Sequence, residues 1–166
     1  MRKEHNQKHR NNPMPLYRKA TVSDANMLID MYMTDIDPDL EHAESFASDL
    51  ITRMETILCL EDDNLCGTVS CAVRGGMNDG VVEITALGVR EQYQRRGIAT
   101  QLINEVIKHS QEVFSSRNYQ LRRVFLFMEE SNDSARQLYT AAGFKEVASI
   151  PDFYPTTGAS IFVRQI

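Results

Sequence analysis

Apolar side chains recur every three to four positions in some segments of the chain and follow one another almost without a break in others. The first pattern predicts helices, among them two that Pro38 separates. The second pattern predicts buried strands, such as the one at residues 81–89 (VVEITALGV). Gly88 lies inside that strand, where its missing side chain indicates a bulge or a close approach by another group.

Two further helices follow in the second half of the chain. One begins after Gly97, and a shorter one is capped by Asn132 and ends at Gly143. The elements run in the order β-α-α-β-β-β-α-β-α-β-β, which predicts an α/β fold with a mixed sheet of seven strands and helices on both faces. The other strands are expected at 16–20, 56–60, 65–73, 122–128, 144–150 and 159–166, with a loop at 151–158 (PDFYPTTG) between the last two.

Length and composition fit one soluble domain at residues 16–166, preceded by a polar arm at 1–15. No apolar run approaches the length of a membrane span, and the N-terminus is too polar for a signal peptide, so we expect a cytoplasmic protein without a membrane partner. The net charge of −5 argues against nucleic acid as a partner and is compatible with a cationic substrate. The three cysteines form no C-x-x-C pair, which favours buried reduced thiols over a disulfide or a metal site.

The segment 94–101 (QRRGIATQ) joins the strand at 81–89 to the next helix, and its chemistry suits an anion. The start of a helix leaves backbone N–H groups without partners and carries partial positive charge, so it binds phosphate well. Gly97 allows the backbone to come close to an oxygen, and Arg95 and Arg96 add positive charge. A chance helix start after a basic turn is the alternative explanation. The glycine patterns of P-loop and dinucleotide-binding proteins are absent.

Two motifs resemble those of the GCN5-related N-acetyltransferases (GNAT). QRRGIA fits that family's Q/R-x-x-G-x-G/A signature through Gln94, Gly97 and Ala99, and residues 131–144 (SNDSARQLYTAAGF) are similar to its second signature. Each motif follows a buried strand, as in the family, and the order of strands agrees over residues 16–166. The resemblance implies a single domain with the GNAT fold and identifies the expected anion as the pyrophosphate of acetyl-coenzyme A.

The resemblance also implies where acetyl-CoA would bind as a cosubstrate, with no metal. In the family, the strand before the first motif bulges and separates from the next strand, and its exposed backbone bonds to the pantetheine arm. The residues implied for the pantetheine are Leu87, Gly88 and Val89, those for the pyrophosphate are Gln94, Arg95, Arg96, Gly97, Ile98, Ala99 and Thr100, and those on the far side of the cofactor are Asn132 and Ala135.

The reaction needs a neutral amine to attack a thioester and a proton for the departing thiolate. Tyr139 matches the tyrosine that commonly acts as the acid in the family, although it could instead be a core aromatic on an amphipathic helix. Glu83 lies at the spacing from Gln94 where histone-acetylating members carry a catalytic glutamate. It is the only charged residue in an apolar run, where desolvation would raise its pKa toward a value useful for a base. It could instead reach solvent at the sheet end, and Glu129 and Glu130 are alternative bases.

The segment 152–166 (DFYPTTGASIFVRQI) resembles the tyrosine-bearing loop and last strand of bacterial protein N-terminal acetyltransferases. The resemblance implies that Phe153 and Tyr154 bind the acceptor. Those enzymes carry a catalytic glutamate where this chain has Phe127, a departure that argues against their mechanism and hence against their substrate.

Acidic side chains between the first two predicted helices border the acceptor in this fold, where they could attract an amine or simply flank the helices: Asp35, Asp37, Asp39 and Glu41. We favour a small primary amine as the acceptor, over a protein N-terminus or a lysine side chain. A non-catalytic acyl-CoA-binding module is a third hypothesis, against which Tyr139 and Glu83 argue. We expect a monomer or a homodimer that does not bind nucleic acid.

Overall fold

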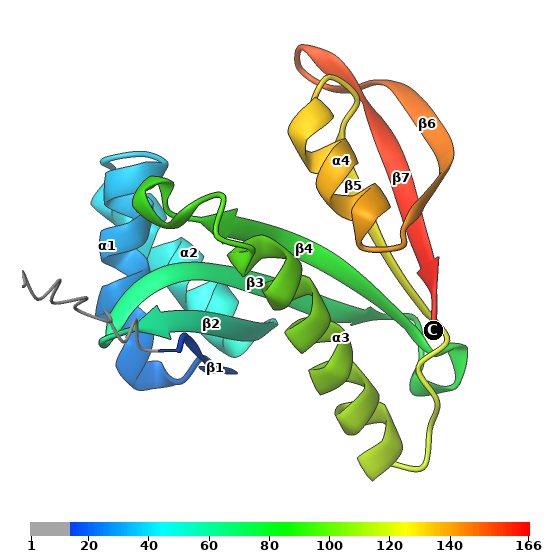
Figure 1. Cartoon of the computed structure of the whole chain (residues 1–166), viewed down its shortest axis with the longest axis horizontal. Helices are drawn as coiled ribbons and strands as arrows, with labels where there is room; N and C mark the ends of the chain where they lie inside the picture. The colour runs from blue at the N-terminus through cyan, green and yellow to red at the C-terminus, as the bar shows by residue number, and fades with distance from the viewer. Residues whose placement is uncertain (1–13) are drawn as a thin grey trace, which may run out of the picture.

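A computed structural model describes residues 14–166 and places them in a seven-stranded mixed sheet with helices against both faces (Figure 1). The strands lie side by side in the order β1-β2-β3-β4-β5-β7-β6. They are β1 Leu16–Lys19, β2 Glu55–Glu61, β3 Asn64–Arg74, β4 Val81–Val89, β5 Arg123–Glu129, β6 Lys145–Tyr154 and β7 Thr157–Gln165. The helices are α1 Ala25–Asp35, α2 Leu40–Thr52, α3 Ile98–Ser116 and α4 Asp133–Ala141, with 3₁₀ turns at Val22–Asp24, Met77–Asp79 and Glu91–Tyr93. The predicted order of strands and helices is confirmed, whereas the arm predicted at 1–15 lies, apart from its last two residues, outside the described residues.

The sheet opens in the middle because β4 and β5 pair over only part of their lengths. Their parallel pairing ends at Glu83 and Phe125, whereas β4 continues to Val89 and β5 to Glu129. The register between β3 and β4 shifts beyond this point, which adds a bulge to β4. Figure 1 shows the two strands diverging, with β2 and β3 beside β4 and with β7 and α4 beside β5. The facing edges of β4 and β5 therefore border a gap in the sheet.

Helices hold the strands beside this gap through apolar side chains on both faces of the sheet. The buried face of α3 includes Leu102, Ile103 and Val106, each at most 1% exposed, which pack on one face of β2, β3 and β4. Leu28 of α1 and Leu50 of α2 belong to a second core on the opposite face. Val82 and Ile84 of β4 belong to the same core as α3, and each fully buried side chain contributes roughly 1.5–3 kcal/mol, so α3 fixes the position of β4.

The loop predicted at 151–158 is wrong. β6 continues through Tyr154, and the turn to β7 contains only the two residues between them. The pairing register shifts between Ile150 and Tyr154, and Asp152 adopts a left-handed φ of 53° inside this bulge. Pro151 is tolerated because β6 is an edge strand and a bulge leaves backbone N–H groups unpaired.

Two kinds of feature are absent from residues 14–166. No helix in this range combines the length and the apolar composition that a membrane crossing requires. No group of three or more His, Cys, Asp or Glu side chains in the same range is arranged to hold a metal ion. Cys59, Cys66 and Cys71 are buried as free thiols, and burial raises the pKa of Cys66 and of Cys71 to about 11. Those two thiols are therefore protonated at neutral pH, and the thiol is the less nucleophilic form.

Candidate active site

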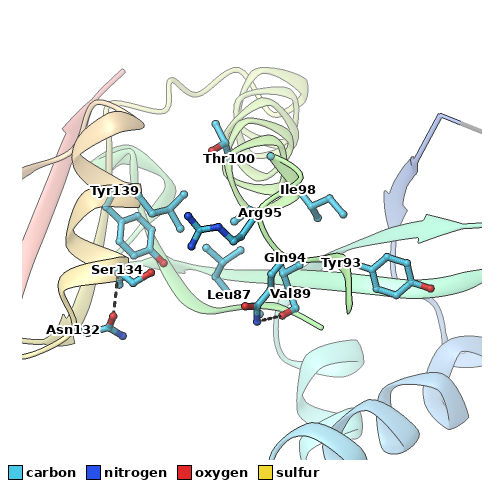
Figure 2. A pocket seen from close by; sticks show the side chains of 15 residues that line it. Leu87, Val89, Tyr93, Gln94, Arg95, Ile98, Thr100, Asn132, Ser134 and Tyr139 are labelled. Atoms are coloured by element: carbon cyan, nitrogen blue, oxygen red, sulfur yellow. Dashed lines mark hydrogen bonds between the residues drawn. The ribbon is translucent and has the colours of Figure 1, made fainter. Parts of the chain in front are cut away.

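A cavity of about 610 Å³ lies where β4 and β5 separate, between the start of α3 and the side of α4 (Figure 2). Its lining contains Tyr139 and every predicted cofactor-binding residue except Arg96. The predicted residues at the cavity are Leu87, Gly88, Val89, Gln94, Arg95, Gly97, Ile98, Ala99, Thr100, Asn132 and Ala135. Sequence reasoning missed Tyr93, Ser134 and Leu138, which also line the cavity. Their places directly before the first motif and inside the second were a signal that could have found them.

The start of α3 presents backbone donors to the cavity. Gly97 precedes the helix with a left-handed φ of 80° and has no side chain that could cap it. The N–H of Gln101 donates to the carbonyl oxygen of Gly97 at 3.1 Å. No acceptor within residues 14–166 takes the N–H groups of Ile98, Ala99 or Thr100. These donors and the positive end of the helix dipole suit an anion.

Two glycines at the cavity differ in whether their backbone φ angle excludes a residue with a side chain. A Cβ built on Gly97 meets no protein atom within 4 Å, but its φ of 80° would strain any residue with a side chain. A Cβ on Gly88 also meets nothing within 4 Å, and its φ is not left-handed. Of the two alternatives predicted at Gly88, a bulge or a close approach by another group, the bulge falls instead at Thr85, which leaves the close approach. Neither packing nor strain within the chain accounts for Gly88.

The two arginines of the first motif point in different directions. Arg95 lies in the cavity lining, and Figure 2 shows its guanidinium reaching toward Tyr139. Arg96 turns instead to the hairpin between β2 and β3, where its Nη1 donates to Oε2 of Glu61 at 3.2 Å. Its guanidinium carbon also lies 5.6 Å from the centre of the Tyr93 ring. Only Arg95 of this pair therefore has its side chain at the cavity.

Tyr139 reaches the cavity from α4. Asn132 caps this helix, because its Oδ1 accepts a hydrogen bond at 3.0 Å from the N–H three residues further on. An ion pair between Arg136 and Glu146 ties the helix to β6. The Tyr139 ring packs edge-on against Phe144 with 5.6 Å between centroids, and Figure 2 shows its hydroxyl pointing into the cavity. Burial of this side chain, which is 7% exposed, raises its pKa to about 12.

The raised pKa of Tyr139 predicts a particular pH dependence if this residue is the acid. Burial disfavours the phenolate, so the hydroxyl keeps its proton well above the ordinary tyrosine pKa of 10.0. We expect kcat to rise as the acceptor amine loses its proton and not to fall again up to about pH 10, where an ordinary tyrosine would be half ionised. Steady-state rates across this range measure the effect. An alkaline fall centred at the ordinary tyrosine pKa would contradict a buried acid.

Glu83 does not line the cavity, and its carboxylate has a partner. It forms an ion pair with Arg74 of the neighbouring strand β3, and its side chain is 16% exposed. The sequence shows Glu83 as the only charge in an apolar run, and β3 adds an arginine partner that no pattern within residues 81–89 reveals. Glu129 and Glu130 lie where β5 ends, and Glu129 is exposed.

Phe153 and Tyr154 belong to a row of four aromatic rings that also contains Phe125 and Phe127. We call these four residues the aromatic row. Phe125 and Phe127 pack edge to face at 5.8 Å, Phe127 stacks on Phe153 at 5.6 Å, and Phe153 meets Tyr154 edge-on at 5.0 Å. Alternate residues of β5 are buried in the core with α4, so the row lies on the opposite face. Phe125 is in register with Glu83, so the row begins where β4 and β5 separate.

The connection between α1 and α2 borders a second cavity, of about 450 Å³, which shares Leu87, Gly88, Val89 and Gln94 with the first. Asp35 forms an ion pair with Nε of Arg90 at 3.0 Å. Asp39 caps α2 by accepting a hydrogen bond at 3.0 Å from a backbone N–H, and this bond lowers its pKa. Asp37 and Glu41 are exposed. Two of the four predicted acidic residues are thus engaged within the chain.

Comparison with known proteins gives both a family and relatives. Residues 25–144 match the model of the Acetyltransferase (GNAT) family. The chain is 37% identical over 71 residues to an N-alpha-acetyltransferase of Sulfurisphaera tokodaii, a match that covers 43% of this chain and 40% of the relative. It is 35% identical over 81 residues to a mycothiol acetyltransferase of Corynebacterium diphtheriae, which covers 49% of this chain and 24% of the relative. Each match spans less than half the length of the relative.

Structural similarity extends over most of the described chain. The structure of Arabidopsis thaliana NAA60 in complex with acetyl-CoA matches with a TM-score of 0.72 and 26% sequence identity, over 92% of this chain and 98% of that one. The segment matched by the family model contains both motifs and every residue of the first cavity. The predicted fold and family are therefore confirmed, and the chain belongs to the GNAT family of acetyltransferases.

Proposed function

We propose that this chain transfers the acetyl group of acetyl-CoA to a primary amine by direct attack on the thioester. One observation carries the proposal. The backbone N–H groups at the start of α3 that lack an acceptor and the hydroxyl of Tyr139 lie at the same cavity. Acetyl-CoA supplies the activated acetyl group. The amine nitrogen bonds to the carbonyl carbon, the carbon–sulfur bond breaks, and the thiolate takes a proton from Tyr139 while the amine loses one to a base.

Each part of the cavity has a role in this proposal. The N–H groups at the start of α3 bind the pyrophosphate, and Arg95 adds a charged donor. The edge of β4 that faces the gap offers backbone groups at Leu87 and Gly88 to the pantetheine arm, whereas the carbonyl oxygen of Val89 accepts a hydrogen bond from Nε2 of Gln94 at 2.9 Å. Glu83 remains the candidate base, with Glu129 and Glu130 as the alternatives.

The aromatic row supports a polypeptide N-terminus as the acceptor. It extends from the gap to the turn between β6 and β7, and Phe153 keeps 51% of its surface exposed. An apolar wall of this length suits the first side chains of a peptide and offers nothing to a polyamine. A small primary amine, the acceptor favoured on sequence grounds, is the second candidate. Exposed carboxylates at Asp37 and Glu41 favour it.

Replacement of Tyr154 by alanine is expected to raise the acceptor KM roughly fivefold, as loss of an interface aromatic costs about 1 kcal/mol or more. The KM for acetyl-CoA should stay nearly unchanged, because Tyr154 does not line the first cavity. Thiol release from acetyl-CoA, with a panel of amines and peptides as acceptors, measures both constants. Loss of thermal stability with an unchanged acceptor KM would show that the aromatic row only packs the sheet.

The same assay tests the proposed function itself. Turnover of peptides but not of small amines would establish the polypeptide acceptor, and the reverse result would establish the small amine. A chain that binds coenzyme A but releases no thiol with any acceptor would instead be a non-catalytic acyl-CoA-binding module.

A further inference from the structure

The contact between Glu61 and Arg96 joins two turns that are 35 residues apart in the sequence. Glu61 is the last residue of β2, and Arg96 lies in the loop that leads into α3. Nη1 of Arg96 donates to Oε2 of Glu61 at 3.2 Å, and Nη2 donates to Oε1. The side chains are 16% exposed for Glu61 and 34% for Arg96. The ion pair is therefore bidentate and partly shielded from water.

The loop at 94–97 needs an external support because its backbone is unusual. Arg95 and Gly97 both adopt a left-handed φ, of 59° and 80°. Glycine adopts this conformation freely, whereas arginine is strained there. Arg96 lies between these two residues. A bidentate ion pair fixes the orientation of its guanidinium group as well as its position.

The hairpin that carries Glu61 provides a firm support. Its two turn residues, Asp62 and Asp63, have φ values of 49° and 62°, which are typical of a tight turn between antiparallel strands. Nδ2 of Asn64 donates to the carbonyl oxygens of Glu61 at 3.3 Å and of Asp62 at 3.0 Å. The carboxylate of Glu61 is thus presented from a turn that is held by its own hydrogen bonds.

We propose that Glu61 is a positioning residue for cofactor binding, although it lies outside the cavity. By holding Arg96, it keeps the loop in the conformation that turns the first N–H groups of α3 toward the pyrophosphate. Without this contact the loop leaves that conformation in part of the molecules. The apparent affinity for coenzyme A then falls in proportion to the fraction of molecules that still have the binding conformation. The inference rests on the proposed acetyl-CoA site and adds to it a residue from outside both motifs.

Calorimetric titration with coenzyme A tests this role. Glu61→Gln keeps the shape of the side chain and removes its charge, and we expect its Kd to rise roughly tenfold, as if one molecule in ten stayed competent. A double variant that exchanges the partners, Glu61→Arg with Arg96→Glu, restores the ion pair with reversed polarity. Its Kd is expected to return to within about threefold of the wild-type value, because the two changes are coupled.

Asp49→Asn is the matched control, because it breaks an ion pair of 3.2 Å between Asp49 of α2 and Arg53 just past the end of that helix. The Kd of this variant for coenzyme A should equal that of the wild type. The positioning role is overturned if Glu61→Gln binds like the wild type, with or without a lower melting temperature. It is also overturned if the exchanged pair binds no better than Glu61→Gln. A wild-type protein that does not bind coenzyme A would refute the proposed function and this role together, whereas normal binding by every variant would refute the role alone.

Discussion

Replacement of Tyr139 by phenylalanine is expected to lower kcat by about 10²-fold and to leave the Kd for coenzyme A nearly unchanged. The substitution keeps the ring that packs against Phe144 and removes only the proton donor. Because burial raises the pKa of Tyr139 to about 12, the wild-type hydroxyl is protonated throughout the neutral range and can donate to the thiolate. Thiol release from saturating acetyl-CoA gives kcat, and calorimetry gives the Kd.

Tyr119→Phe is the matched control for this experiment. It removes a phenolic hydroxyl from a side chain that is 40% exposed and lies outside the cavity, so its turnover should equal that of the wild type. Full turnover by the Tyr139 variant would mean that water or another group protonates the thiolate. Tyr139 would then serve only as a core aromatic of α4.

Replacement of Gly97 by valine is expected to weaken coenzyme A binding by at least about 10²-fold. A left-handed conformation costs a residue with a side chain roughly 1–2 kcal/mol, so the backbone at the start of α3 shifts. Each hydrogen bond that the anion then loses is worth about 1.5–3 kcal/mol. The loss of two such bonds costs about 3–6 kcal/mol, which exceeds the roughly 2.7 kcal/mol of a 10²-fold change. Calorimetry measures the affinity, and circular dichroism confirms that the variant is folded.

Gly76→Ala provides the comparison for a glycine with an ordinary backbone. Gly76 has a φ of −87°, and a Cβ there would lie 3.7 Å from its nearest neighbour, so alanine fits without strain. This variant should bind coenzyme A like the wild type. Unchanged affinity in a folded Gly97→Val variant would refute the assignment of the pyrophosphate to the start of α3.

Much of the fold could be predicted because its signals are local. The cap at Asn132, the glycine at 143 and the apolar run at 81–89 each mark an element through residues that are close in sequence. The two motifs located the first cavity for a related reason. Each follows a strand beside the gap, so the fold brings them together.

The features that could not be predicted depend on partners elsewhere in the chain. Arg74 reaches Glu83 from the neighbouring strand, and Glu61 turns Arg96 away from the cavity. Nothing within either arginine's own segment indicates these partners. The extension of β6 through Tyr154 depends in the same way on pairing with β7, because the prolines around it, taken alone, are typical of a loop.

The brief pairing of β4 with β5 has a consequence for synthesis on the ribosome. β1 to β4 pair only with strands next to them in sequence, so this half of the sheet can form once residue 89 has emerged. The other half must wait for β7, which inserts between β5 and β6 although it follows both of them. The cavity lies between α3 and α4, which pack on different halves, so we expect a nascent chain to complete its ligand site only after β7 has been made.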